Sequence, residues 1–381
     1  MNLFIIDCEF LLMTSSAPNQ PTKNPRPHHE MADPEMTDHE SHNEIHDDEI
    51  HNHETVHHEV NDHHIAKGYD VKVSILLGLL YGVVAQLVAR LGFARDVFIV
   101  MSFSYVIILP FCLGFLSIAS ATTEQRQKIL SVIIRPILLV LLCMLISLIV
   151  GWEGTICVAM AIPIYIPLAV AGGFVAKLYY KNKTTLYAIL SIPIVLAPLE
   201  TDYIPLPKEI RTVHTSITLS ASAQDIWPHI IRVKPITEPQ SGFFYKMGFP
   251  KPVEATLSHE GVGGVREAKF EGGLTFFETI VEWVPLQKIR FTIQAHPNTV
   301  PITTLDPHVV PGGAFFEALE GCYEIQPHPH DPTKIILHLS SRYRLSTHFN
   351  IYASWWGDWL MKDIQDNILQ VIYQRVQQHK I

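Results

Sequence analysis

The chain has 381 residues, of which 48% are hydrophobic and 17% are charged, and its mean hydropathy is +0.19. Soluble domains carry about 25% charged residues, so this composition argues against a wholly soluble single domain. The net charge of −9 arises in residues 28–64, which hold twelve Asp or Glu, eleven His and no Lys or Arg; outside them, 28 basic residues nearly balance the other 25 of the 37 acidic ones. No basic stripe with interleaved aromatic residues is visible in the sequence, which argues against nucleic-acid binding.

Residues 1–66 are predicted to be a disordered tail, because their hydrophobicity is low and their acidic residues repel one another. Neutral imidazoles in this tail suit loosely bound zinc or nickel. The candidate metal ligands are His46, His51, His53, His57 and His58. The spacing fixes no coordination geometry, so a solvated tail and a metal- or pH-responsive tail both stay open.

Residues 67–204 are predicted to be an all-helical transmembrane region of four or five helices. Four apolar stretches reach the roughly 20 residues that a helix needs to cross the hydrocarbon core. They are residues 71–89, 97–119, 129–150 and 155–177. A fifth stretch, residues 184–199, is marginal in length and contains Pro193 and Pro198, so a short interfacial helix would have the same sequence pattern.

The distribution of Lys and Arg around these stretches predicts the orientation of the chain. Most of the basic residues near the span ends fall on the side of the N-terminal tail, which is therefore expected in the cytoplasm. The C-terminal domain lies outside the cell with five spans and inside with four.

Residues 209–381 show a different periodicity. Seven runs alternate apolar and polar residues as half-buried strands do, and a helical insertion at residues 221–233 follows the first run. The chain closes with an amphipathic helix predicted over residues 349–377, which is rich in Trp. This order of elements predicts an α+β domain.

Several sequence features carry a family resemblance. They are the segment Ser220–Trp227 (SASAQDIW) after the first strand, the glycine-rich turn 261–264, the strand end Trp283-Val284-Pro285 and the Trp-rich closing helix. With them, the domain resembles the polyketide cyclase/dehydrase and lipid-transport superfamily, the START-like or SRPBCC helix-grip fold. That resemblance implies a curved seven-stranded antiparallel sheet around the long C-terminal helix, with a cavity for an apolar ligand. The chain is also similar to membrane-anchored bacterial members, which implies an integral protein of the bacterial inner membrane.

Period-2 alternation on the strands and the apolar stripe of the helix predict which side chains line this cavity. The alternation places Phe277, Thr279, Val281 and Trp283 on one face of their strand. The candidate ligand-binding residues are Phe277, Phe291, Tyr323, Leu337, Trp355 and Trp359. Since cavities and cores share composition, these side chains filling a core is the competing interpretation.

Two sets of polar residues are candidates for chemistry. Asp306 and His308, in a loop with a Gly-Gly hinge, are candidates for general acid–base catalysis together with Tyr323, although a plain solvated turn explains the loop equally well. The second set is Arg266, Glu278, Glu320 and Arg342, which lie on predicted strands. These charges are expected to face water, with ion pairs across the sheet or a polar anchor in the cavity as the alternatives.

Three functions are compatible with this sequence. The first is a membrane-anchored protein that binds or transports a hydrophobic molecule, either a lipid or a polyketide-like compound, with the bilayer and that molecule as partners. The second is a polyketide cyclase/dehydratase-type enzyme that uses Asp306, His308 or Tyr323 in the same cavity. The third is a metal- or pH-responsive membrane protein that acts through the His-rich tail.

Overall fold

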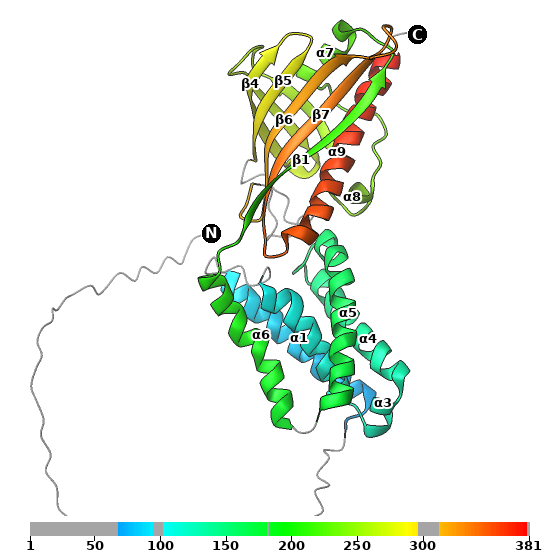
Figure 1. Ribbon diagram of the computed structural model, residues 1–381, viewed down its shortest axis with the longest axis vertical. Helices are drawn as coiled ribbons and strands as arrows, with labels where there is room; N and C mark the ends of the chain where they lie inside the picture. The colour runs from blue at the N-terminus through cyan, green and yellow to red at the C-terminus, as the bar shows by residue number, and fades with distance from the viewer. Residues whose placement is uncertain (1–67, 94–101, 181–182, 296–311, 379–381) are drawn as a thin grey trace, which may run out of the picture. The chain divides into compact units, whose positions relative to one another are not determined.

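The computed structural model describes residues 68–93, 102–180, 183–295 and 312–378. The chain divides into two units, Met1–Asn61 and Asp62–Ile381, and all described residues belong to the second. The predicted disordered tail, residues 1–66, therefore lies outside the described residues. Within the second unit, helices precede an α+β domain (Figure 1).

The first part of the second unit contains long apolar helices. They are α1 (Val71–Phe93), the π-helical turn η2 (Ser104–Ile108) continued by α2 (Leu109–Ala119), α4 (Ile129–Ile149), α5 (Thr155–Tyr179) and α6 (Lys183–Tyr203), with the short α3 (Thr123–Gln127) between α2 and α4. Among the described residues, three helices are long and apolar enough to cross a membrane, at Val71–Ala89, Ile129–Ile149 and Thr155–Tyr179. Ser104–Ala119 and Thr184–Ala197 are apolar but shorter, and part of the predicted second span, residues 97–101, lies outside the described residues.

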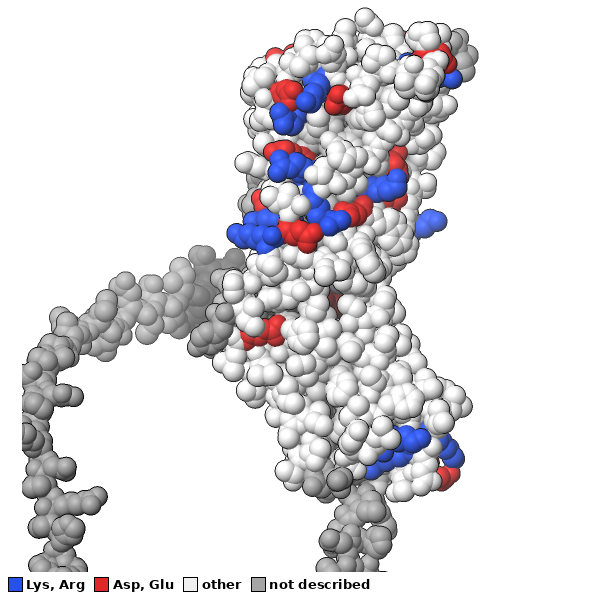
Figure 2. All heavy atoms as spheres, viewed as in Figure 1, with Lys and Arg blue, Asp and Glu red and all other residues white. Residues whose placement is uncertain are grey.

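Backbone contact between α2 and α5 depends on two glycines. A Cβ atom at Gly114 would lie 1.8 Å from the carbonyl oxygen of Ala169, and one at Gly172 would lie 2.0 Å from that of Phe111. Small residues such as Gly let the backbones of apolar helices approach closely, so that van der Waals packing holds the helices together. In the view of Figure 2, most of the surface of these helices is uncharged, with an acidic group near the domain and a cluster of charged side chains at the far end, whereas more charged side chains lie over the domain that follows.

The domain contains one antiparallel sheet of seven strands in the order β1-β7-β6-β5-β4-β3-β2 (Figure 1). The strands are β1 (Lys208–Leu219), β2 (Pro252–Leu257), β3 (Val265–Phe270), β4 (Thr275–Val284), β5 (Lys288–Ala295), β6 (Phe316–Pro327) and β7 (Ile335–Ser346). The remaining elements are α7 (Ala223–Ile231), α8 (Phe243–Lys246), the 3-10 turn η3 (Glu271–Gly273) and α9 (Asn350–Gln378). The predicted α+β class, the seven-stranded sheet and the long C-terminal helix are confirmed.

The helix α7 begins at Ala223, two residues after the predicted start at residue 221, because Ser222 and Asp225 form a capping box. Ser222 Oγ accepts a hydrogen bond from the backbone N–H of Asp225 at 3.3 Å, and the carboxylate of Asp225 accepts one from the N–H of Ser222 at 3.0 Å. These reciprocal bonds satisfy two amides that the first turn of a helix leaves unpaired. Ile226 and Ile230 then project into the main core with Leu369 and Ile372 of α9.

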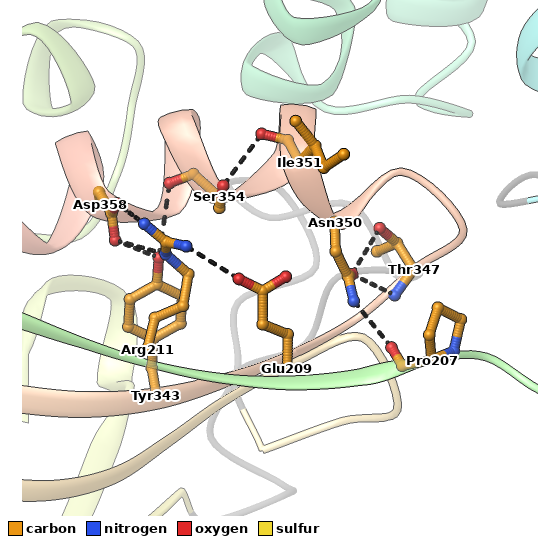
Figure 3. Close-up of polar contacts among 9 residues, drawn as sticks. All are labelled: Pro207, Glu209, Arg211, Tyr343, Thr347, Asn350, Ile351, Ser354 and Asp358. Atoms are coloured by element: carbon orange, nitrogen blue, oxygen red, sulfur yellow. Dashed lines mark hydrogen bonds and ion pairs between the residues drawn. The ribbon is translucent and has the colours of Figure 1, made fainter.

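The helix α9 is fixed to the sheet near its start by a polar network (Figure 3). Arg211 on β1 binds both carboxylate oxygens of Asp358 on α9, at 3.1 and 2.6 Å, and the hydroxyl of the fully buried Tyr343 on β7 donates to Asp358 at 2.7 Å. Burial alone would raise the pKa of Asp358, but the hydrogen bonds from Arg211 and Tyr343 outweigh it and hold that pKa below its usual value. Gly357 permits this approach, since a Cβ atom there would lie 2.8 Å from the Tyr343 hydroxyl.

The strand β4 contains a bulge that changes which side chains face inward. The pairing of β4 with β5 shifts between Ile280 and Glu282. Ile280 is 1% exposed and Trp283 packs against the same core, whereas Phe277 is 36% and Val281 45% exposed. The prediction that Phe277 and Val281 share an inner face with Trp283 is therefore wrong, because the extra residue of the bulge reverses the alternation within the strand.

Candidate functional site

An apolar cavity of about 370 Å³ lies between the sheet and α9. Its sheet side is formed by Phe276, Glu278, Phe291, Ile293, Tyr323 and Leu339. Gly321 on β6 leaves room for the ring of Phe291, since a Cβ atom there would lie 2.5 Å from that ring. The volume falls in the range of roughly 300–1,000 Å³ that small-molecule sites occupy.

One face of α9 forms the opposite side of the cavity. Its lining residues recur at every fourth position, as Tyr352, Trp356, Leu360, Ile364 and Ile368. Residues four apart lie above one another on an α-helix, so this spacing gives a continuous apolar strip. The same helix therefore serves two purposes: its first half lines the cavity, and its second half also holds core residues such as Leu369 and Val376.

The lining continues onto the helices that precede the domain. Gly82 and Gln86 of α1, Ser147 of α4, and Ile156 and Tyr165 of α5 all border the same cavity. Two hydrogen bonds join the parts here: the Tyr352 hydroxyl donates to the carbonyl of Met160 at 2.6 Å, and the Thr155 hydroxyl donates to that of Met247 at 2.6 Å. The cavity thus borders both the sheet domain and the apolar helices.

A buried ion pair lies in the wall of this otherwise apolar cavity. Arg266 on β3 stands opposite Glu278 on β4, and Arg266 Nη1 is 2.8 Å from Glu278 Oε2, with the side chains 4% and 12% exposed. The guanidinium carbon of Arg266 lies 5.1 Å from the ring centre of Phe291 and 5.9 Å from that of Tyr323. A planar, weakly hydrated guanidinium stacks well on aromatic rings, which makes its burial tolerable.

The expectation that charged residues on strands face water is wrong for this pair. Arg342 and Glu320 are in contact with water as expected: they pair at 2.9 Å, and their side chains are 44% and 28% exposed. In both pairs the two residues stand opposite each other on neighbouring strands, so the pairs differ only in burial. Among the described lining residues, Glu278 and Glu153 are the charged ones.

Burial controls the protonation of the polar groups in the cavity wall. It raises the pKa of Glu278, and the nearby Arg266 opposes that rise. Burial also raises the pKa of Tyr323 to about 12, which Arg266 lowers and Glu278 raises in turn. Tyr323 therefore keeps its proton at neutral pH and acts there as a hydrogen-bonding phenol rather than as a general base.

Only some of the six predicted ligand-binding residues line the cavity. Phe291 and Tyr323 line the cavity, and Leu337 is fully buried in the adjacent core. Phe277, on the outer side of the bulged strand, lies outside the lining.

Trp355 and Trp359 also lie outside the cavity, with 68% and 44% of their surfaces exposed. The apolar stripe of α9 is broad at this end, and the sequence cannot say which part of it faces inward. Trp356, one residue further than Trp355, is turned by about 100° around the helix and lines the cavity. At this end of the helix, Ile351, Trp355 and Trp359 repeat at every fourth position just as Tyr352, Trp356 and Leu360 do, so the spacing does not distinguish the two rows.

The other predicted site residues cannot be placed. Asp306 and His308 lie outside the described residues, as do the tail histidines His46, His51, His53, His57 and His58. Within the described part of the chain, no group of three or more His, Cys, Asp or Glu could hold a metal ion. The acid–base loop and the zinc or nickel site stay predictions.

Comparisons with known proteins give structural neighbours only. No family model matches the chain, and no curated protein matches its sequence. Among solved structures, the chain is similar to the Zhui aromatase/cyclase from Streptomyces sp. R1128, with 12% identity and a TM-score of 0.30 over 45% of this chain and 97% of that one. It is also similar to norcoclaurine synthase from Thalictrum flavum, a point mutant in complex with a transition-state analogue, with 13% identity and a TM-score of 0.27 over 46% and 99% of the two chains.

A third neighbour is XoxI from Bacillus cereus, with 13% identity and a TM-score of 0.29 over 45% of this chain and 98% of that one. These similarities concern less than half of the chain. The α+β architecture given above rests on the strand order and on α9 themselves.

Proposed function

We propose that this protein is anchored in a membrane by its apolar helices and binds a hydrophobic molecule, a lipid or a polyketide-like compound, in the cavity between the sheet and α9. The observation that carries the proposal is the continuity of the apolar lining from Phe291 on the sheet to Ile156 and Tyr165 on α5. A ligand that leaves the bilayer along such a lining avoids exposure of its apolar surface to water, which costs about 25 cal/mol per Å².

The ion pair in the cavity wall supports binding of a molecule that also carries a polar group. Burying two charges is costly, and a buried pair rarely improves stability over apolar side chains of similar volume. Arg266 Nε makes no hydrogen bond to other described residues, and Glu278 Oε2 lies 2.8 Å from Arg266 Nη1. A ligand hydroxyl or amine at Glu278 would give the carboxylate a second polar partner while its apolar body contacts the remaining lining.

The test is to purify the full chain in detergent and identify co-purifying molecules by native mass spectrometry and lipid extraction. We expect an apolar molecule in near-stoichiometric amount. In an Ile364→Trp variant, the larger side chain projects from α9 into the cavity, so we expect the co-purifying molecule to be lost. A dansyl-labelled long-chain alcohol serves as the probe for direct binding.

Lys362→Trp is the matched control, because Lys362 lies on the same helix, outside the cavity lining, with 61% of its side chain exposed. It should retain both the molecule and the probe. An empty natural chain that takes up neither lipid nor probe would contradict ligand binding, and would mean that side chains close the cavity.

Membrane anchoring is tested independently by alkaline carbonate extraction of membranes from cells that produce the full chain. We expect the protein to stay in the membrane pellet, since detaching even one apolar spanning helix from a bilayer exposes its entire apolar surface to water. Recovery in the carbonate-soluble fraction would contradict anchoring.

The enzyme alternative has no specific support among the described residues. Tyr323 is protonated at neutral pH, which suits a general acid and not a general base, and Asp306 and His308 lie outside the described part of the chain. If the co-purifying molecule is converted to product, a His308→Ala substitution would show whether that loop takes part: an enzyme using His308 loses turnover and retains binding.

A further inference from the structure

The first half of α9 carries an exposed aromatic stripe next to the face that lines the cavity. Ile351, Trp355 and Trp359 recur at every fourth position and are 81%, 68% and 44% exposed. Phe243 of α8, which is 37% exposed, stacks on Trp359 with ring centres 4.6 Å apart. We call these four residues the aromatic stripe.

Such a surface is unusual for a part of a protein that faces water. Exposed apolar residues are normally scattered singly, and a contiguous group of them marks an interaction surface. Trp is the most informative member, because its amphipathic ring is enriched where a hydrocarbon phase meets water. Arg or Lys side chains do not interrupt the stripe between Ile351 and Trp359.

The position of the stripe next to the start of the apolar helix α5 identifies its partner. Tyr352, next to Ile351 on α9, is hydrogen-bonded to Met160 in the second turn of α5. Close to the other end of the stripe, Thr155, the first residue of α5, donates a hydrogen bond to the carbonyl of Met247, the C-cap residue of α8. The helix α5 is long and apolar enough to cross a membrane, so its first turns lie at the level where hydrocarbon gives way to lipid headgroups.

We propose that the aromatic stripe docks into the headgroup region of the bilayer that the apolar helices span. This rests on the membrane anchoring proposed above and adds the contact that holds the cavity at the bilayer surface. Consecutive residues of a helix are about 100° apart, so a stripe at Ile351 and Trp355 in the headgroup region places the cavity face at Tyr352 and Trp356 directly beside it. An apolar ligand would then pass between lipid and cavity along α9.

The experiment measures tryptophan quenching in the full chain reconstituted into zwitterionic phosphatidylcholine vesicles. The lipids carry bromine either close to the headgroup or near the end of the acyl chain. We expect the headgroup-proximal bromines to quench a component of the emission that is lost in Trp355→Phe and Trp359→Phe variants. Trp227→Phe is the matched control, because Trp227 is 7% exposed and lies in the core edge-on to Trp283.

Other results separate the two proposals. Trp152, in the turn before α5, reports whether the helices themselves are inserted, through the loss of its quenched component in Trp152→Phe. If Trp152 is quenched by bromolipid while Trp355 and Trp359 are quenched only by aqueous iodide, the stripe faces water and its docking is overturned. Quenching of the stripe only by the deep bromines overturns its placement in the headgroup region. A chain that does not insert, with no quenching of Trp152, overturns the anchoring and the docking with it.

Discussion

The apolar helices and the sheet domain bury their interiors by different means. The helices bury side chains such as Phe115 and Leu139, but α2 and α5 also touch through backbone at Gly114 and Gly172. Other large side chains of the helices, such as Leu76 and Ile149, are 64% and 75% exposed. In the sheet domain the contact is made by side chains, with Ile226, Ile280 and Leu337 almost fully buried. With the membrane anchoring proposed above, the difference follows from the surroundings: lipid provides no hydrophobic driving force between helices, so close packing must hold them together, whereas water drives apolar side chains together.

Both parts bury a charged residue. Arg135 of α4 is 6% exposed, and the sheet domain buries Arg266 with Glu278 beside aromatic rings. Close backbone packing and buried side chains are therefore two kinds of contact that single substitutions can disrupt separately.

The largest effect is expected from removing one partner of the buried pair. Arg266→Met leaves the carboxylate of Glu278 without its cation, and breaking a buried pair in this way costs about 3–5 kcal/mol of the free energy of unfolding. Thermal unfolding of the full chain in detergent, followed by tryptophan emission, measures the loss.

Arg342→Met is the matched control on the same sheet. Its partner Glu320 is partly exposed, and exposed pairs are worth about 0–1 kcal/mol. Arg266→Met combined with Glu278→Leu removes both buried charges and should recover most of the stability. Equal losses from the two single variants would contradict the burial of Arg266.

The next largest effect is expected where the helices touch through backbone. Gly172→Ala adds a Cβ atom within 2.0 Å of the Phe111 carbonyl oxygen, so α2 and α5 must move apart, and overpacking of this kind costs about 1–3 kcal/mol. Leu145→Ala is the control, since its side chain on α4 is 50% exposed. The two melting temperatures in detergent should differ clearly, and a Gly172→Ala chain as stable as Leu145→Ala would show that the helices are not in contact here.

The sequence predicted the elements of the domain well because the relevant signals are local. Alternation identified the strands, the apolar residues of the segment 221–233 identified α7, and the amphipathic pattern after Phe349 identified α9. The apolar stretches likewise predicted the helices, although the described part of the second one is shorter than expected.

The candidate site was predicted only in part because it depends on register and rotation. Phe291 and Tyr323 are on the cavity wall as expected, but nothing local reveals that Arg266 stands opposite Glu278, or that Trp356 rather than Trp355 faces inward. Such facts arise when distant segments pair, which is why the alternation rule failed at the bulge of β4.

A smaller effect, visible only in acid, is expected from the network that fixes α9. The folded pKa of Asp358 lies below its unfolded value, so its contribution to stability is present above the unfolded value of about 3.9 and is lost as the pH falls through the folded one. Asp358→Asn should therefore lower stability near neutral pH and flatten the acid side of the stability profile. Asp366→Asn, on the same helix with its side chain 52% exposed, should leave that profile in place.

The smallest effect is expected at the outer face of β4, where it tests the bulge directly. Val281 is 45% exposed, so Val281→Thr should change the free energy of unfolding by no more than about 0.5 kcal/mol. Ile280, 1% exposed in the main core, should lose several times more as Ile280→Thr, because burying a hydroxyl without a partner adds to the lost apolar contact. Unbroken alternation from Trp283 would give the opposite order, with Val281 inside and Ile280 outside. The ranking of two adjacent residues in one unfolding experiment therefore decides which side chains this strand presents to the cavity.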